Sequence, residues 1–193
     1  MVRNIYYFPV MVLVLASVMS PKNENMKSSG DQPVPVSHVD LRRYVGNWYE
    51  IARIPNFFES KCAMNATVTY VLQKDNEIGV VNQCFDKDGK AHIAKGIAKV
   101  VDQETCAKLK VSFVKILGVH LFWGDYWIIG LDKDYRYAVV GTPSRKYGWI
   151  LSRTPKLSSG EFDKINEILR NQGYNPSDFV PTPQMERDST PGK

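Results

Sequence analysis

The sequence predicts an all-β protein: an eight-stranded antiparallel up-and-down barrel with one C-terminal α-helix packed outside it. Apolar and polar residues alternate with a period of two over most of the chain, as they do in half-buried strands. Clusters of turn-forming residues divide this pattern into short, evenly spaced runs, which favours a sandwich or a barrel. Eight antiparallel strands with short links close naturally into a barrel, because closure removes the exposed strand edges.

Residues 1–20 have the composition of a secretory signal peptide. Arg3 precedes an almost wholly apolar run, residues 5–18, which ends among small residues. The run is shorter than the roughly 20 residues of a transmembrane helix, although an uncleaved membrane anchor is the alternative. No cysteine precedes Cys62, so this segment offers no acceptor for a lipoprotein acyl chain. We therefore expect an exported protein that is periplasmic or associated with the outer membrane, or else secreted.

The rest of the chain divides into a linker, one domain and a tail. Residues 21–37 are polar and rich in Lys, Asn, Ser and Pro, which predicts a flexible linker. The folded domain is expected over residues 38–184, a length that suits a single hydrophobic core. Residues 185–193 are expected to be a disordered tail.

Eight strands are expected in the domain. The clearest alternation runs from Lys108 to Phe113, where apolar side chains share one face and polar side chains occupy the other. Short runs of Asp, Lys, Gly, Pro and Ser separate the strands and predict turns. The expected strands are residues 46–54, 65–73, 78–85, 91–101, 107–114, 125–132, 135–141 and 147–153.

One helix is expected after the last strand. Ser158 and Glu161 have the spacing of a capping box, and Gly173 is a good terminator. Three apolar residues between them lie on one helical face, so the helix should pack against the outside of the barrel. These residues are Phe162, Ile165 and Leu169.

The three cysteines suggest one disulfide and one free thiol, because an exported protein folds in an oxidising compartment and three is an odd number. Cys62 and Cys84 flank one predicted hairpin, and linking them would contribute roughly 3 kcal/mol. Cys106 is then the free thiol. Three unpaired buried thiols are the alternative.

The composition argues against several classes of partner and cofactor. The net charge is +5, but the basic residues are spread through strand-like segments and form no patch or known motif, so we expect no nucleic-acid partner. The three histidines are isolated in the sequence, which also lacks a glycine-rich phosphate loop and metal-ligand spacing. No cofactor and no metal site are expected.

Three segments together resemble the lipocalin family. They are Gly46–Glu50 at the start of the first strand, Leu131–Tyr135 between the sixth and seventh, and Trp149–Pro155 at the end of the eighth. Their order and spacing, with the helix that follows, match lipocalins over nearly the whole domain. The residues of the first and third segments are similar to those of one branch of the family, which contains the bacterial outer-membrane lipocalins and apolipoprotein D.

The resemblance implies that three residues close one end of the barrel and bind no ligand. Gly46 allows a close approach of the chain as it enters the barrel. Trp48 plugs the closed end, and Arg153 lies across its ring. A guanidinium over an indole contributes roughly 1–2 kcal/mol in a partly dry site.

The resemblance also implies a ligand pocket inside the barrel, with Trp149 and Tyr70 on its wall. Alternation places Trp48, Glu50 and Ala52 inward on the first strand. The same logic adds five apolar residues to the ligand-binding face, with ordinary core packing as the alternative for each. These are Tyr137, Val139, Leu109, Val111 and Phe113.

Residues 115–124 form a long apolar segment at the expected barrel mouth. Phe57 and Phe58 belong to another mouth loop, and Lys115, Arg145 and Lys146 flank this apolar rim. The rim is expected to contact a membrane or to extend the pocket upward. A lid folded over the mouth is the alternative.

The resemblance therefore implies the binding, storage or transport of a small hydrophobic ligand. For the bacterial branch this is a fatty acid or lysophospholipid in membrane maintenance at the cell envelope. We expect no enzymatic activity, since Cys106 adjoins a closed-end turn and no histidine lies near it in sequence to act as a base. The alternatives are a lipocalin-fold enzyme acting on a lipid, and a membrane-surface or protein-interaction role that includes a homodimer.

Overall fold

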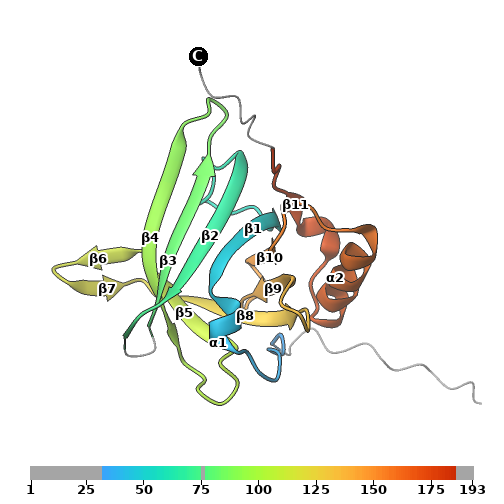
Figure 1. The fold of residues 1–193 in the computed structure, drawn as a ribbon, viewed down its shortest axis with the longest axis horizontal. Helices are drawn as coiled ribbons and strands as arrows, with labels where there is room; N and C mark the ends of the chain where they lie inside the picture. Colours follow the sequence, from blue (N-terminus) through green and yellow to red (C-terminus); the bar gives the residue numbers. More distant parts are fainter. Residues whose placement is uncertain (1–31, 75–76, 186–193) are drawn as a thin grey trace, which may run out of the picture.

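The computed structural model describes residues 32–74 and 77–185. Its strands form a closed antiparallel barrel in which each strand pairs with its neighbour and β1 also pairs with β10 (Figure 1). This confirms the predicted fold class. The barrel strands are β1 (Gly46–Arg53), β2 (Met64–Leu72), β3 (Glu77–Phe85), β4 (Ala91–Val100), β5 (Lys108–Ser112), β8 (Gly124–Leu131), β9 (Tyr137–Gly141) and β10 (Gly148–Ser152).

Short elements complete the barrel. The helix α1 (Leu41–Tyr44) lies at one end, called here the closed end, and the opposite end is the mouth. Between β5 and β8, the strands β6 (Val114–Ile116) and β7 (Val119–Leu121) form a hairpin that projects from the barrel (Figure 1). After α2 (Ser159–Asn171), a 3-10 turn, η2 (Pro176–Asp178), leads to β11 (Val180–Pro181), which pairs with the end of β1.

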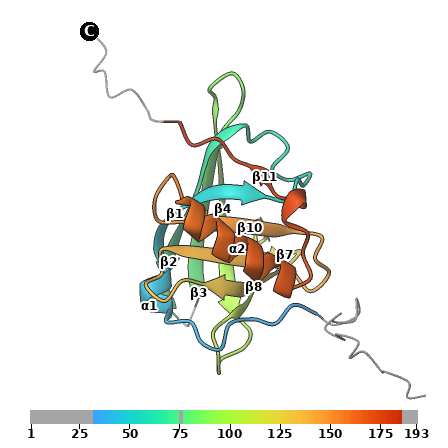
Figure 2. The same ribbon diagram turned by 90° about the vertical axis from the view of Figure 1, so that its right-hand side faces the viewer.

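The helix α2 packs across the outside of the barrel (Figure 2), as the sequence predicts. The Ser158 side chain accepts from the Glu161 backbone N–H, and the Glu161 carboxylate accepts from the Ser158 backbone N–H, which completes the capping box. Ile165 and Leu169 are fully buried against the barrel. Gly173 ends the helix in the left-handed region, at φ 75°.

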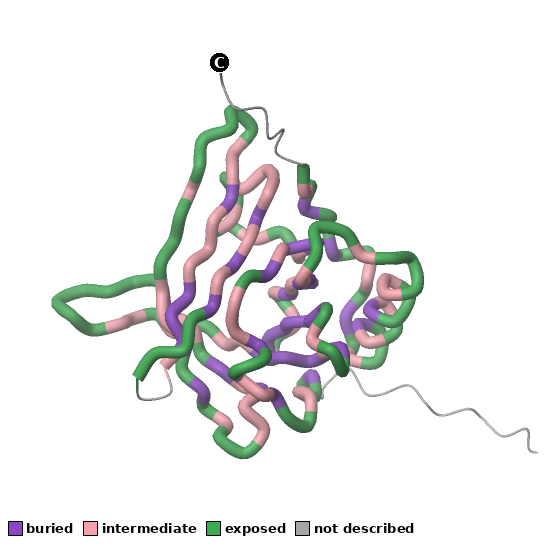
Figure 3. Tube along the Cα trace, viewed as in Figure 1, coloured by how far each residue is buried: buried purple, intermediate pink, exposed green. Residues whose placement is uncertain are grey.

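Two apolar clusters stabilise the fold, one inside the barrel and one between the barrel and α2. Buried residues follow the barrel strands and the inner side of α2, whereas the β6–β7 hairpin is largely exposed (Figure 3). Within the described residues, no helix has both the length and the apolar character needed to cross a membrane.

The chain ahead of the barrel differs from the prediction where the structure describes it. Residues 32–37 fall in the expected linker, yet they lie along the barrel. Val36 N donates to Ile128 O at 2.9 Å, and Val34 exchanges two hydrogen bonds with the Gln172 side chain. The predicted signal peptide, most of the linker and residues 186–193 of the tail lie outside the described residues.

A β-bulge in β1 changes which side chains face inward. The pairing with β10 shifts register between Glu50 and Ala52, which inserts one extra residue into β1. Glu50 lies on the wall of the barrel interior, but Ala52 belongs to the outer cluster with Ile51. The inward orientation predicted for Ala52 is therefore wrong, because strict alternation holds only up to the bulge.

Candidate ligand-binding site

The interior of the barrel contains a cavity of about 780 Å³. This volume is within the range of small-molecule sites, roughly 300–1,000 Å³. Its wall is mainly apolar and aromatic, and it is formed by both sheet residues and mouth loops. Apolar residues of the inner cluster that line it include Val68, Ile78, Val80, Ala98 and Leu151.

Five of the seven residues predicted to face a ligand lie on the cavity wall. They are Trp149, Tyr70, Leu109, Val111 and Phe113. Phe113 follows the last residue of β5, at the base of the β6–β7 hairpin, and it is 39% exposed. These five residues come from β2, from β5 and its end, and from β10, which the barrel brings together around one space.

Tyr137 and Val139 lie on the other side of β9, in the outer cluster under α2. Their predicted inward orientation is wrong. Every residue of β9 is buried, because α2 covers its outer face and the apolar cluster inside the barrel covers its inner face. Ala138 and Val140 are the inward residues, and Val140 pairs directly with Trp149 on β10.

The closed end is built as the resemblance implied. Trp48 is fully buried, and the Arg153 guanidinium carbon lies 3.8 Å from its ring centroid. The two terminal nitrogens of Arg153 donate to four backbone carbonyls between residues 43 and 47. Gly46 has φ 96°, and a Cβ there would lie 3.4 Å from an Arg153 nitrogen. Backbone conformation and space therefore both favour glycine.

Three tyrosine hydroxyls meet at the deep end of the cavity, and we call them the tyrosine triad. Tyr126 Oη lies 2.7 Å from Tyr44 Oη and 2.8 Å from Tyr70 Oη. All three side chains line the cavity. Burial raises the pKa of each hydroxyl above its usual value. All three therefore keep their protons at physiological pH. Tyr44 and Tyr126 are not among the pocket residues predicted from the sequence.

A charged cluster lies where the mouth loop, residues 54–63, meets the cavity. Glu59 Oε2 accepts from Trp149 Nε1 at 3.2 Å and from Asn56 Nδ2, and it lies 3.7 Å from Arg53 Nε. Arg53 forms a closer ion pair with Glu50. One guanidinium thus serves two carboxylates. Burial, followed by the nearby Glu50 charge, raises the pKa of Glu59.

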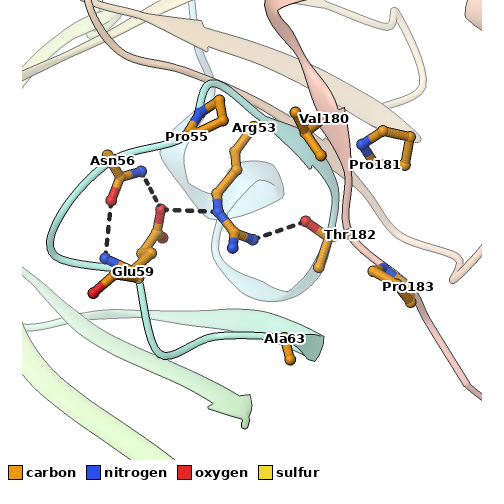
Figure 4. Close-up of a pocket in the computed structure, with 10 residues that line it drawn as sticks. Arg53, Pro55, Asn56, Glu59, Ala63, Val180, Pro181, Thr182 and Pro183 are labelled. Atoms are coloured by element: carbon orange, nitrogen blue, oxygen red, sulfur yellow. Dashed lines mark hydrogen bonds and ion pairs between the residues drawn. The ribbon is translucent and has the colours of Figure 1, made fainter. Parts of the chain in front are cut away.

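The same cluster borders a second, smaller pocket of about 360 Å³ on the outside of the barrel (Figure 4). This pocket lies between the mouth loop and the C-terminal segment 180–183. Arg53 Nη1 donates to Thr182 Oγ1 at 3.0 Å across it. Glu59 lines both the outer pocket and the cavity, so its side chain is part of the wall between them.

The charge on the cavity wall is one-sided. Of the described residues that line it, none is Lys or Arg, whereas three are acidic: Glu50, Glu59 and Asp125. His92 is the sole histidine among these lining residues, and its Nε2 lies 2.9 Å from an Asp86 oxygen. The described part of the chain holds no group of three or more His, Cys, Asp and Glu side chains placed to bind a metal ion.

The disulfide follows the prediction. Cys62 and Cys84 are bonded, with their Cα atoms 5.4 Å apart, and Cys106 is free. The bond joins the end of the mouth loop to β3, and both cysteines border the cavity. Cys106 lies in the turn that follows β4, away from the cavity wall.

Most of the apolar mouth segment, residues 115–124, belongs to the β6–β7 hairpin. Its base contributes Val114, Phe122 and Trp123 to the cavity wall. Its tip projects outward, with Leu117 98% exposed and Ile116 and Val119 more than half exposed. The hairpin therefore extends the pocket at its base and does not fold over the mouth as a lid.

The chain is similar to one known family along most of its length. Residues 39–184 match the family described as "Lipocalin-like domain". The chain is 37% identical over 154 residues to temperature-induced lipocalin-1 of Arabidopsis thaliana, covering 78% of this chain and 82% of that protein. It is 38% identical over 146 residues to outer membrane lipoprotein Blc of Escherichia coli, covering 75% and 79%.

An animal relative and a solved structure extend this similarity. Apolipoprotein D of Mus musculus is 30% identical over 159 residues, covering 79% of this chain and 80% of that protein. Insecticyanin from the tobacco hornworm Manduca sexta superimposes with a TM-score of 0.63 at 20% identity, covering 79% of this chain and 84% of that chain. At this low identity, the match to insecticyanin supports the barrel architecture alone.

Proposed function

This chain belongs to the lipocalin family, and from that premise we propose that its barrel binds, stores or carries one fatty acid or lysophospholipid. The observation that supports this most is the cavity of about 780 Å³, with its apolar and aromatic wall. Burying an acyl chain there is favourable by roughly 0.8 kcal/mol for each methylene removed from water.

We place this activity in membrane maintenance at the cell envelope, in a protein exported to the periplasm or associated with the outer membrane. The printed name of the Escherichia coli relative, an outer membrane lipoprotein, supports this compartment. Secretion is the alternative that we predict from the sequence.

We propose a binding function without catalysis. Nucleophilic catalysis needs a nucleophile and a base within hydrogen-bond reach. Cys106 does not line the cavity, and the lining histidine, His92, faces Asp86. Glu59 is the lining carboxyl whose pKa is raised, and it accepts from Trp149 and Asn56, an arrangement that anchors the mouth loop.

A membrane contact through the hairpin is a second proposal. Residues 113–124 contain Lys115 and His120 but no acidic residue, and Leu117 stands fully in solvent at the tip. Exposed apolar side chains beside a basic residue are suited to an anionic lipid surface. The hairpin would then place the barrel mouth next to the membrane from which a lipid is taken.

Native mass spectrometry of the protein purified from its own host tests the main proposal. We expect one acyl lipid per chain, released on unfolding and identified by its fragments. A co-purified molecule with no acyl chain, bound one to one, would contradict the proposed ligand class.

A further inference from the structure

The tyrosine triad contains one more hydrogen-bond donor than it can use. Each phenol has one proton, so the triad has three donors, while its members make two hydrogen bonds with each other. Among the described residues, these hydroxyls make no other hydrogen bond. Whichever way the two bonds are oriented, one O–H is left without an acceptor.

The spare donor faces the deep end of the cavity. Tyr44 comes from α1 and packs against Trp48, with ring centroids 5.1 Å apart and the rings tilted by 40°, and Trp48 closes the barrel. Tyr70 and Tyr126 lie on β2 and β8 and also line the cavity. A long ligand that enters through the mouth therefore reaches the triad with its leading end. A plain methyl terminus would leave the donor buried and unsatisfied, which is costly.

The charge around the cavity indicates what kind of acceptor fits. None of the described lining residues is Lys or Arg, and Glu50 and Glu59 are on the wall. Arg153 lies behind Trp48 with its nitrogens donating to backbone carbonyls. A carboxylate pushed to the deep end would be buried without a cation on the wall, which is strongly unfavourable. An uncharged oxygen has no such cost.

We propose that the tyrosine triad is a specificity site for lipids that carry an uncharged hydroxyl or carbonyl oxygen at the end inserted first. This inference rests on the proposed lipid-binding function and makes the ligand more specific: an oxygenated acyl chain in place of a plain one. The spare hydroxyl donates to the ligand oxygen, which completes the hydrogen bonding of the deep end.

A matched ligand pair tests the proposal: hexadecanoic acid and omega-hydroxyhexadecanoic acid, which differ by one terminal hydroxyl. The measured quantity is the ratio of their dissociation constants in the delipidated full chain. The parent should bind the hydroxylated acid at least as tightly as the plain one. The triple variant Tyr44→Phe, Tyr70→Phe, Tyr126→Phe should bind the hydroxylated acid at least about tenfold more weakly, relative to the plain acid, than the parent does, because the ligand hydroxyl loses its partner.

Two further variants separate the triad from general effects. Tyr126→Phe alone removes the shared hydroxyl but leaves at least one spare donor, so the preference for the hydroxylated acid should remain. Tyr137→Phe makes the same chemical change at a buried tyrosine in the outer cluster, and the ratio should not change. Thermal unfolding of each variant checks that it is folded. If the triple variant does not fold, the parent alone still tests the proposal, because tighter binding of the plain acid than of the hydroxylated acid by the parent overturns it.

The outcomes are distinct. An unchanged ratio in the triple variant, with both acids still bound, overturns the inference and leaves the proposed function intact. Weaker binding of plain hexadecanoic acid in the triple variant, at an unchanged ratio, would mean that the carboxylate enters first, and it also overturns the inference. If the parent binds neither acid, the proposed function fails and the inference fails with it.

Discussion

Arg153 lies across the face of Trp48, with its guanidinium carbon 3.8 Å from the ring centroid. Arg153 directly follows the last barrel strand, β10, and Trp48 is in β1, so the contact lies where these two strands close the barrel. The guanidinium also donates to the carbonyl oxygens of Arg43, Tyr44, Val45 and Asn47. This one side chain therefore holds α1 and the start of β1 over the closed end.

Replacing Arg153 by Ala should destabilise the barrel without removing the pocket. The variant loses the cation–π contact and the hydrogen bonds of a charged donor, which predicts a loss of about 2–3 kcal/mol in the free energy of unfolding. Urea denaturation measures this loss. Arg170→Ala, at an exposed position on α2, is the control and should change stability by less than about 0.5 kcal/mol. Unchanged stability with abolished ligand binding would refute the assigned geometry.

Trp149 should report ligand entry through its fluorescence. Its ring lies on the cavity wall and its Nε1 donates to Glu59, so an acyl chain beside it should displace water and change the emission. Trp149→Phe should remove most of the titratable signal and weaken binding about tenfold, since a large apolar contact contributes roughly 1.5–3 kcal/mol.

The control for this experiment is Trp127→Phe. Trp127 is also buried, but it lies in the outer cluster, so the variant should keep the signal and the affinity. If Trp149→Phe binds lysophospholipid as tightly as the parent and keeps the signal, the ligand does not contact this wall.

Glu59 should make the parent protein less stable as the pH rises. Burial and the Glu50 charge raise the pKa of Glu59 in the folded state, so the folded protein holds this proton more firmly than the unfolded chain. The associated stability is fully present below the unfolded pKa, about 4.3, and is lost as the pH rises through the folded pKa. Glu59→Gln cannot ionise and should be more stable than the parent at pH 8, with a flatter profile.

Glu161→Gln should behave in the opposite way. The hydrogen bonds from Ser158 lower the pKa of Glu161, so its carboxylate stabilises the fold above the unfolded pKa. The variant should be less stable than the parent at pH 7, and the difference should shrink as the pH falls below about 4.3. Denaturant titrations at several pH values measure both variants. If the free energy of unfolding depends on pH in the same way for the parent and Glu59→Gln, the raised pKa assigned to Glu59 is contradicted.

The hairpin tip should govern binding to anionic vesicles. Leu117 is 98% exposed and has φ 48°, a conformation that Asp tolerates well, so Leu117→Asp should fold normally. In flotation with phosphatidylglycerol vesicles, we expect this variant to bind at least about tenfold more weakly than the parent, because a charge replaces the apolar tip. Its affinity for a lysophospholipid below the critical micelle concentration should not change.

Val101→Asp is the matched control for the hairpin, since Val101 is exposed beyond the end of β4, outside the hairpin. It should bind vesicles almost as well as the parent. Equal losses in both variants would show that net charge, and not the hairpin tip, sets the interaction.

The sequence predicts much of the barrel because its signals are local. Alternation gives the eight barrel strands to within a few residues, and Ser158 and Glu161 give the start of α2. Orientation is less predictable where two faces are buried. In β9 the outer residues Tyr137 and Val139 are as apolar as the inner ones, so alternation carries no information there.

The rest of the site depends on features with weak local signals. The bulge in β1 reverses the inward and outward pattern after Glu50. No residue type in β1 predicts this bulge from the sequence. The tyrosine triad joins three distant segments, one of them the four-residue helix α1, which is too short to leave a periodic pattern. The hairpin has one sequence signal, Gly118, because its two turn residues, Leu117 and Gly118, have positive φ, as a type I′ turn requires, and glycine adopts that conformation readily.

The pairing of β1 with β10 affects how quickly this chain can reach its native state. Arg153 and Asn47, joined by a hydrogen bond at this seam, are 106 positions apart in sequence. Contacts of such long range require a large loop to be closed before they contribute any stability, and barrels rich in them fold in milliseconds to seconds. The neighbouring hairpins, which join strands adjacent in sequence, have no such cost. We therefore expect refolding to be limited by formation of this seam, so substitutions of Trp48 or Arg153 that weaken it should slow refolding more than they speed unfolding.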